Sequence, residues 1–221
     1  NMIFNKFFIL FKIGRKIGKS NIINIVSETH KIPVFIKIFF NLLAFSFSSS
    51  KDTKSKENLS ASIQEMGTTF IKLGQFLATR PDIIGEKLSK ELESLQDKLP
   101  PFSKKEAEKI IIENLGQSNF DDIIDLSDPI AAASIAQVHK AKIKEDNIIK
   151  NVAIKVLRPN IKKIFNDEID AIMLLAYIVE SLITKTKRLK LIEVVFLFKE
   201  ITNHEMDLSL IHISEPTRLS R

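Results

Sequence analysis

The sequence predicts an α+β chain in which a helical first part leads into a small antiparallel sheet, followed by two further helices. Apolar residues recur at spacings of three and four from Leu59 to Leu77 and from Ile161 to Thr184, as in helices with one buried face. Between these stretches, β-branched runs alternate with short turns, which is typical of strands. The 221 residues are 44% hydrophobic, enough to bury a core.

Residues 1–50 are expected to form basic amphipathic helices that are divided near Pro33. A linker is expected at 51–58. Residues 1–60 contain ten Lys or Arg and three acids, a net charge of +7, and nine of the sixteen phenylalanines. This combination is typical of helices that lie on an anionic membrane surface, and equally of amphipathic helices that pack on their own protein. Nucleic-acid binding is disfavoured, because bulky aliphatic residues separate the basic ones and no nucleic-acid-reading module is recognisable.

A helical extension is expected over residues 59–118. Its three helices are expected from Leu59 to about Pro81, from about Gly85 to Leu99, and from Ser103 to about Gly116. The third start is the best defined, because Ser103 and Glu106 form a capping box in which each side chain can bond the other residue's backbone N–H. Pro100 and Pro101 are expected to end the second helix.

A sheet-bearing domain is expected over residues 119–207. Its strands are expected to begin at Asp128-Pro129, to run from Ile135 to Ile143, and to run from Asn151 to Leu157. Residues 144–147 form the second turn, and helices follow at about 161–184 and 191–207.

The most specific pattern in the chain is the first turn of this sheet and the strand after it. The turn reads Ala131-Ala132-Ala133-Ser134-Ile135-Ala136-Gln137-Val138, and Val152-Ala153-Ile154-Lys155 places a lysine 17 residues after Val138. With alanine in place of each glycine, this is the protein-kinase G-x-G-x-x-G-x-V loop followed by its V-A-I-K strand. Such a loop covers nucleotide phosphates with backbone N–H groups. Because alanine disfavours positive φ and close backbone approach, this loop should be stiffer than a glycine loop.

Together with Lys72-Leu73-Gly74-Gln75 and Glu205-Met206-Asp207, these motifs resemble the UbiB-type (aarF-domain, ADCK) atypical kinases over about residues 59–207, and most closely their bacterial ubiquinone-biosynthesis members. The resemblance implies a protein-kinase-like N-lobe that holds ATP or ADP. The implied nucleotide-binding residues are Ala131, Ala132, Ala133, Ser134, Ala136, Val138 and Lys155.

The resemblance also implies the catalytic residues. Lys155 would contact the α- and β-phosphates, while Lys72 and Gln75 would lie on a helix that folds across the cleft. Lys72 would there meet Glu205 and Asp207 of the E-x-D element. No metal ligands are predicted, because cysteine is absent and the four histidines lack metal-ligand spacing.

As a function, the resemblance implies an Mg²⁺-dependent ATPase or atypical kinase that supports ubiquinone biosynthesis on the cytoplasmic side of the bacterial inner membrane. Quinone precursors or other proteins of that pathway would be its partners. The alternative is a membrane-associated scaffold that binds a nucleotide without turning it over. Hydroxylase chemistry has no support, because the sequence carries no flavin fingerprint and no iron-ligand cluster.

The end of the chain departs from the family pattern. The family places the glutamate partner of its lysine six residues beyond the E-x-D glutamate, where this chain has Ile211, while ordinary kinase spacing would nominate Glu168 or Asp170. The eleven residues from Leu208 to Arg218 match the translation of a transposon-end sequencing adapter, so 208–221 are expected to be non-native. We therefore expect this chain to lack the C-lobe of a full-length family member. Mg²⁺ is expected to bind only in the full-length protein, and this chain alone is expected to be inactive.

Overall fold

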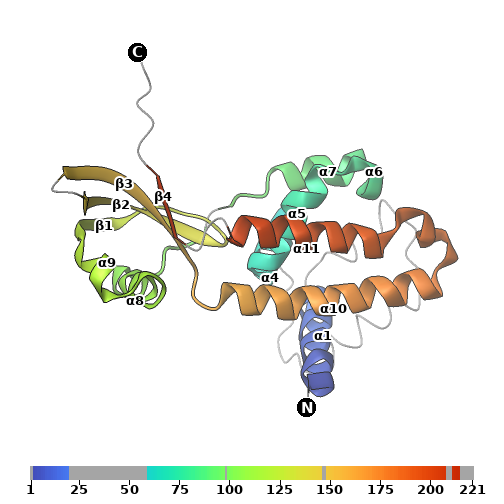
Figure 1. Ribbon diagram of the computed structural model, residues 1–221. Helices are drawn as coiled ribbons and strands as arrows, with labels where there is room; N and C mark the ends of the chain where they lie inside the picture. The colour runs from blue at the N-terminus through green and yellow to red at the C-terminus, as the bar shows by residue number, and fades with distance from the viewer. Residues whose placement is uncertain (1, 20–58, 98, 146–147, 208–210, 215–221) are drawn as a thin grey trace. The chain divides into compact units, whose positions relative to one another are not determined.

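The chain folds into two compact units, each of which is described separately. The computed structural model describes residues 2–19, 59–97, 99–145, 148–207 and 211–214 (Figure 1). One unit comprises residues 1–96 and 163–200, and the other comprises 97–162 and 201–221. In the described residues the first unit is helical and the second carries the sheet, so the predicted α+β class is confirmed.

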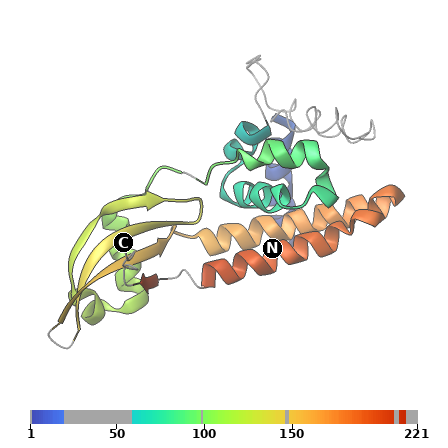
Figure 2. The ribbon, with the colours of Figure 1, turned by 90° about the horizontal axis from the view of Figure 1, so that it is seen from above.

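The first unit is built around a pair of long antiparallel helices. Its elements are α1 (Met2–Lys19), α4 (Leu59–Met66), α5 (Thr68–Ala78), α6 (Pro81–Ile84), α7 (Glu86–Glu93), most of α10 (Ile161–Leu182), the 3-10 helix η1 (Thr184–Leu189) and the first part of α11 (Leu191–Asp207). α10 and α11 lie side by side in both views (Figures 1 and 2). The ring of Phe198 on α11 lies 5.7 Å from that of Phe165 on α10 and 5.6 Å from that of Phe76 on α5. These aromatic contacts tie α5 to the helix pair.

α1 is the first of the predicted amphipathic helices, and one side of it packs within this unit. Ile13 is buried, and Lys16 Nζ donates a 2.7 Å hydrogen bond to the carbonyl oxygen of Met66. Phe8 and Phe11 remain exposed. One face of α1 therefore packs on the protein, as one of the two interpretations of this segment expects, while Phe8 and Phe11 remain on the surface. The second predicted helix and the linker at 51–58 lie outside the described residues.

Two helix boundaries in this unit were predicted wrongly. The helix expected from Leu59 breaks at Gly67, whose φ of 104° separates α4 from α5. Glycine alone adopts that conformation without strain. α7 ends at Glu93 instead of continuing to residue 99. Ser94 is the C-cap residue, and its hydroxyl donates a 2.8 Å hydrogen bond to the carbonyl oxygen of Glu91 in the last turn.

The second unit is a sheet covered on one face by a helix. It contains α8 (Lys104–Leu115), α9 (Gln117–Asp121) and the strands β1 (Ile123–Ala132), β2 (Ala136–Glu145), β3 (Ile148–Leu157) and β4 (Ile211–Ser214). The strands pair antiparallel in the order β1-β2-β3-β4, so the predicted small antiparallel sheet is confirmed. The expected non-native segment 208–221 includes β4, whose backbone pairs with β3.

The start and end of α8 follow the predicted signals. The Ser103 side chain accepts a 3.2 Å hydrogen bond from the Glu106 N–H, which caps the helix. Gly116, with a φ of 82°, ends it. From α8, Ala107 and Ile111 pack against Val152, Ile154 and Val156 of β3, and these buried side chains form the core of the unit.

Pro129 lies inside a strand and does not begin one. β1 starts at Ile123, and its pairing with β2 shifts register on both sides of Pro129. A proline has no N–H to donate to a neighbouring strand, so it is tolerated where a strand lies at the edge of a sheet or is bulged. β3 likewise begins at Ile148, earlier than the predicted Asn151, because the β-branched Ile148 and Ile149 continue the pairing with β2.

Candidate functional site

Strand register brings the alanine-rich turn and Lys155 together. Ala131 on β1 lies opposite Val138 on β2, and Val138 lies opposite Lys155 on β3. Residues directly opposite one another in antiparallel strands point to the same face of the sheet. The three residues therefore form one row across the sheet, although 17 residues separate Val138 from Lys155 in the sequence.

This row lies on the sheet face opposite α8. Ile154 and Val156 point toward Ala107 and Ile111 of α8, and successive residues of a strand alternate between faces. Lys155, between them, is directed to the other face together with Val138 and Ala131. Lys155 and Val138 are half-buried, and Ala131 is exposed.

The tip of the alanine hairpin is held by two charged side chains that bond one peptide group. The carbonyl oxygen of Ala133 accepts hydrogen bonds from Arg158 Nε at 3.0 Å and Nη2 at 2.9 Å. The N–H of the same peptide, which belongs to Ser134, donates a 2.7 Å hydrogen bond to Asp97 Oδ1. The neighbouring Ala133 N–H bonds the carbonyl oxygen of Ala136 at 2.8 Å. We call the bonds of Arg158 and Asp97 to this peptide the hairpin clamp.

Arg158 also connects the hairpin to the segment before α8. Its Nη2 donates to the carbonyl oxygens of Pro100 at 3.0 Å and Leu99 at 3.4 Å, and its guanidinium lies 5.9 Å from the centre of the Phe102 ring. Burial lowers the pKa of Arg158 from its ordinary value, and the nearby negative charge of Asp97 opposes that shift. The lowered pKa reflects the removal of this guanidinium from water.

A buried polar network lies beside the hairpin clamp. The Gln137 amide accepts from the Phe102 N–H at 2.9 Å and donates to the Phe102 carbonyl at 3.2 Å. Its Nε2 also lies 2.9 Å from His139 Nε2, and His139 Nδ1 lies 2.9 Å from the Ser127 carbonyl. Since a carbonyl only accepts, Nδ1 donates and Nε2 receives the Gln137 proton. This network joins β1 and β2 to the chain entering α8.

No role was predicted from the sequence for Asp97, Arg158, Gln137 or His139. A signal existed for the last two, because these polar residues occupy alternate positions of β2 whose side chains point toward the core. No sequence signal pairs Asp97 or Arg158 with the hairpin, since each lies more than twenty residues from its bonding partner.

The other predicted site residues fall in both units. Lys72 and Gln75 lie on α5 of the first unit, both half-buried. Glu205 and Asp207 lie at the end of α11 in the second unit, where Asp207 Oδ1 accepts a 2.7 Å bond from Lys162 Nζ. Of the two acids nominated by ordinary kinase spacing, Glu168 lies 3.8 Å from Lys16 and Asp170 lies 3.6 Å from Lys199.

Gly74, between Lys72 and Gln75, permits close packing of α5. A Cβ at this position would lie 2.8 Å from Cδ1 of Leu95 and 3.4 Å from Cγ2 of Ile63. The glycine in this motif therefore has a packing role within the first unit.

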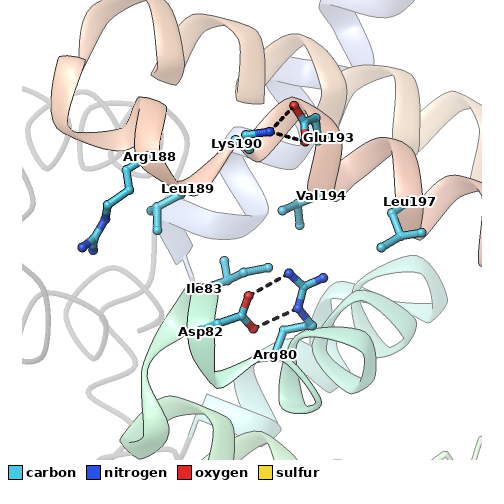
Figure 3. Close-up of a pocket in the computed structure, with 9 residues that line it drawn as sticks. All are labelled: Arg80, Asp82, Ile83, Arg188, Leu189, Lys190, Glu193, Val194 and Leu197. Atoms are coloured by element: carbon cyan, nitrogen blue, oxygen red, sulfur yellow. Dashed lines mark hydrogen bonds and ion pairs between the residues drawn. The ribbon is translucent and has the colours of Figure 1, made fainter.

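A surface pocket of about 560 Å³ lies in the first unit (Figure 3). Leu189 and Val194 point across it toward Ile83 and the paired side chains of Arg80 and Asp82. Its lining combines apolar residues with two exposed ion pairs, Arg80–Asp82 and Lys190–Glu193. Among the described residues that were predicted as site residues, none lines this pocket.

The residues around the hairpin tip fit the phosphate end of a nucleotide. Lys155 supplies a cation on the row that includes Ala131. Ser134 Oγ, also at the tip, is buried and finds no hydrogen-bond partner among the described residues. The described ranges contain no cluster of three His, Asp or Glu side chains that could hold a metal ion. None of the helices in these ranges has the length and apolar character needed to cross a bilayer.

Comparison with known proteins confirms the family that the motifs resemble. Residues 94–210 match the family model described as the ABC1 atypical kinase-like domain. The chain is 34% identical over 179 residues to a protein of Marinobacter nauticus named "Probable protein kinase UbiB", and 35% identical over 181 residues to one of that name from Shewanella baltica. Each match covers 80% of this chain and 32% of the relative. This chain thus spans about a third of the length of these curated relatives.

Proposed function

Because this chain belongs to the ABC1 atypical kinase-like family, we propose that it forms the nucleotide-binding part of an atypical kinase or ATPase that supports ubiquinone biosynthesis. The proposed chemistry is inferred from the family, and the proposed position of the nucleotide is inferred from the sheet. ATP or ADP would lie with its phosphates under the hairpin formed by residues 131–136, near Lys155. Mg²⁺ would bind in the longer protein, together with residues beyond this chain.

The observation that carries this proposal is the row formed by Ala131, Val138 and Lys155. A kinase-type loop can act on a phosphate only if the strand lysine reaches the same phosphate. The antiparallel register places Lys155 and the alanine turn in one row of the same sheet. Their nearness therefore depends on the fold of this unit alone. A lysine is suited to this position because its ammonium group is a compact point charge for phosphate oxygens.

A second candidate function is a scaffold that binds nucleotide without turnover. It is favoured by the hairpin clamp, because the N–H groups of Ala133 and Ser134 already bond groups of the protein. A loop whose donors are occupied offers fewer of them to a transferring phosphoryl group. Turnover distinguishes the two functions, since only the enzyme hydrolyses or transfers the terminal phosphate.

The partners and location belong to the same proposal. Quinone precursors, or proteins that process them, would be the partners of the longer protein on the cytoplasmic side of the bacterial inner membrane. Exposed Phe8 and Phe11 on α1, in a segment rich in lysine, support contact with an anionic membrane surface. Lys16, in contrast, bonds Met66 within the first unit.

The test is a fluorescence titration of this chain with a fluorescent ADP analogue. Lys155→Met should weaken binding about tenfold, the effect of losing roughly 1.4 kcal/mol of interaction. Lys140→Met is the matched control, because Lys140 is exposed and lies on the same sheet face, opposite Ala153. Equal affinity of the two variants would contradict the proposed role of Lys155.

Turnover is tested in the longer Marinobacter nauticus relative with Mg²⁺ and ATP. Phosphate release that disappears when the lysine aligned with Lys155 becomes methionine supports the enzyme. Tight nucleotide binding without phosphate release, in the presence of anionic vesicles as well as in their absence, supports the scaffold.

A further inference from the structure

We propose that Asp97 is an internal anion seated on the alanine hairpin, and that a nucleotide phosphate binds the Ser134 N–H by displacing the Asp97 carboxylate. This inference rests on the proposed nucleotide-binding function and deepens it. It assigns to Asp97 a role that neither the kinase-type motifs nor the family resemblance contains: the side chain competes with the ligand for one backbone donor.

The geometry of the hairpin clamp supports the competition. Asp97 Oδ1 lies 2.7 Å from the Ser134 nitrogen, a length typical of a hydrogen bond strengthened by a charge. A carboxylate oxygen and a phosphate oxygen are equivalent acceptors for such a donor. The bond therefore shows that the hairpin tip accommodates an anionic oxygen, with Asp97 as its occupant in this structure.

Arg158 makes this donor stronger. It bonds the oxygen of the peptide group whose N–H faces Asp97, and a hydrogen bond to one end of a peptide polarises the other end. Arg158 also brings a positive charge into a half-buried region that includes Asp97 and Leu99. With the Asp97 charge removed, Arg158 and Lys155 would leave the hairpin region more positive, which favours an incoming phosphate.

The alanines explain why the competition centres on one donor. The Ala133 N–H is taken by the Ala136 carbonyl at 2.8 Å, which closes the turn. Turning this N–H outward would require backbone conformations that glycine adopts readily and alanine does not. The Ser134 N–H, in contrast, bonds a side chain, and a side chain can leave by rotating about its own bonds.

A purely structural role for Asp97 makes the opposite prediction. If its carboxylate only holds the hairpin in shape, its loss would disorder the binding site and weaken nucleotide affinity. If it competes with phosphate, its loss would raise the affinity. The direction of the change therefore decides between the two roles.

The experiment compares Asp97→Asn, Asp97→Ala and the control Asp125→Asn with the unsubstituted chain. Asparagine retains an oxygen of the same shape and removes the charge, while alanine removes both. Asp125 is exposed on β1 and lies 3.3 Å from Lys142, so its neutralisation controls for a general change in net charge. Circular dichroism verifies that each variant is folded before binding is measured.

Two readouts are used, fluorescent ADP binding and hydrogen exchange of the Ser134 amide with and without pyrophosphate. We expect Asp97→Asn to tighten ADP binding about tenfold, by removal of a competing charge-assisted bond, and Asp125→Asn to change it less than twofold. Without ligand, the Ser134 amide should exchange faster in Asp97→Ala, and pyrophosphate should restore its protection. Unchanged or weaker ADP binding by folded Asp97→Asn overturns the inference.

The pyrophosphate readout separates this inference from the proposed function. Pyrophosphate that protects the Ser134 amide in Asp97→Ala, while none of the proteins binds the ADP analogue, would contradict the nucleotide function and support the anion seat. Failure of pyrophosphate to protect this amide in Asp97→Ala would overturn the inference whatever the ADP titration shows.

Discussion

The hairpin clamp and the surface pocket use the same kinds of charged side chain in different ways. At the hairpin, Arg158 and Asp97 each bond the backbone peptide between Ala133 and Ser134. In the pocket, Arg80 and Asp82 bond each other, with Nη2 of the arginine 2.7 Å from Oδ2 of the aspartate. Charges directed at a half-buried peptide fix the conformation of the backbone, whereas exposed charges that pair with each other are screened by water and constrain little.

The pKa shifts of the two arginines point in opposite directions, because burial dominates at Arg158 and a hydrogen bond to a carboxylate dominates at Arg80. Burial lowers the pKa of Arg158, because the surroundings of the hairpin disfavour its charge. The hydrogen bond from Arg80 to Asp82 raises the pKa of Arg80, because that arginine stays in water and gains a negative partner. Removing each arginine should therefore have very different consequences for stability.

The largest effect is expected from Arg158→Ala. It removes bonds to the carbonyl oxygens of Ala133, Pro100 and Leu99 and leaves these acceptors without their cation, which should lower the free energy of unfolding by about 3 kcal/mol. Urea denaturation followed by circular dichroism measures this. Arg80→Ala is the matched control and should leave the urea midpoint nearly unchanged. Equal losses of stability in the two variants would contradict the proposed difference between charges that bond backbone and charges that bond each other.

The next effect is expected from Gln137→Leu, which tests the buried network beside the hairpin clamp. Leucine has a similar size but leaves the N–H and carbonyl of Phe102, and Nε2 of His139, without their partner. We expect the free energy of unfolding to fall by about 2 kcal/mol, the cost of buried polar groups that lose their hydrogen bonds. Gln117→Leu, at an exposed position of α9, is the control. A loss below about 0.5 kcal/mol for Gln137→Leu would show that water replaces the amide.

A smaller effect is expected from Ser103→Ala, where a side chain bonds backbone at the surface. The Ser103 hydroxyl accepts from the Glu106 N–H and caps α8, and loss of such a cap lowers stability by about 1 kcal/mol. Thermal denaturation should show a lower melting temperature for Ser103→Ala. Ser103→Asp should show no such decrease, because its carboxylate can also cap the helix. No decrease for the alanine variant would indicate that burial, and not the bond to backbone, accounts for the effects at Arg158 and Gln137.

The smallest effect is expected from Asp82→Asn, and it should depend on pH. Arg80 lowers the pKa of Asp82 below its ordinary value of 3.8, so the ion pair stabilises the folded chain above about that pH and loses its effect as the pH falls through the lowered pKa. The urea midpoints of the variant and the unsubstituted chain should therefore differ slightly at pH 7 and converge below pH 3.8. A difference that grows on acidification would contradict the assignment of the pair.

The parts of this protein that follow local rules could be predicted from the sequence. The capping box of α8 and the apolar periods of α10 and α11 depend on residues within a few positions of one another. The alanine turn and Lys155 were also predictable as a pair, because a short antiparallel hairpin fixes register over a small separation. Their position in one row follows from the pairing of neighbouring strands and does not depend on distant segments.

The contacts that fix the hairpin tip could not be predicted, because they join distant segments. Asp97 and Ser134 are 37 residues apart, and Arg158 lies 58 residues from Pro100. Such contacts depend on how α8 packs against the sheet, which periodicity does not reveal. The break at Gly67 was missed for a different reason: a glycine inside a helical pattern is compatible with either a helix or its interruption.

Pro129 has a consequence for the behaviour of the protein in concentrated solution. β1 lies at one edge of the described sheet and carries the exposed Ile124 and Ile130, features that invite strand addition from another molecule. The missing N–H of Pro129, with a register shift on each side of it, interrupts the ladder that an added strand would need. Strand addition along this edge would therefore be interrupted at Pro129, which disfavours a continuous intermolecular sheet.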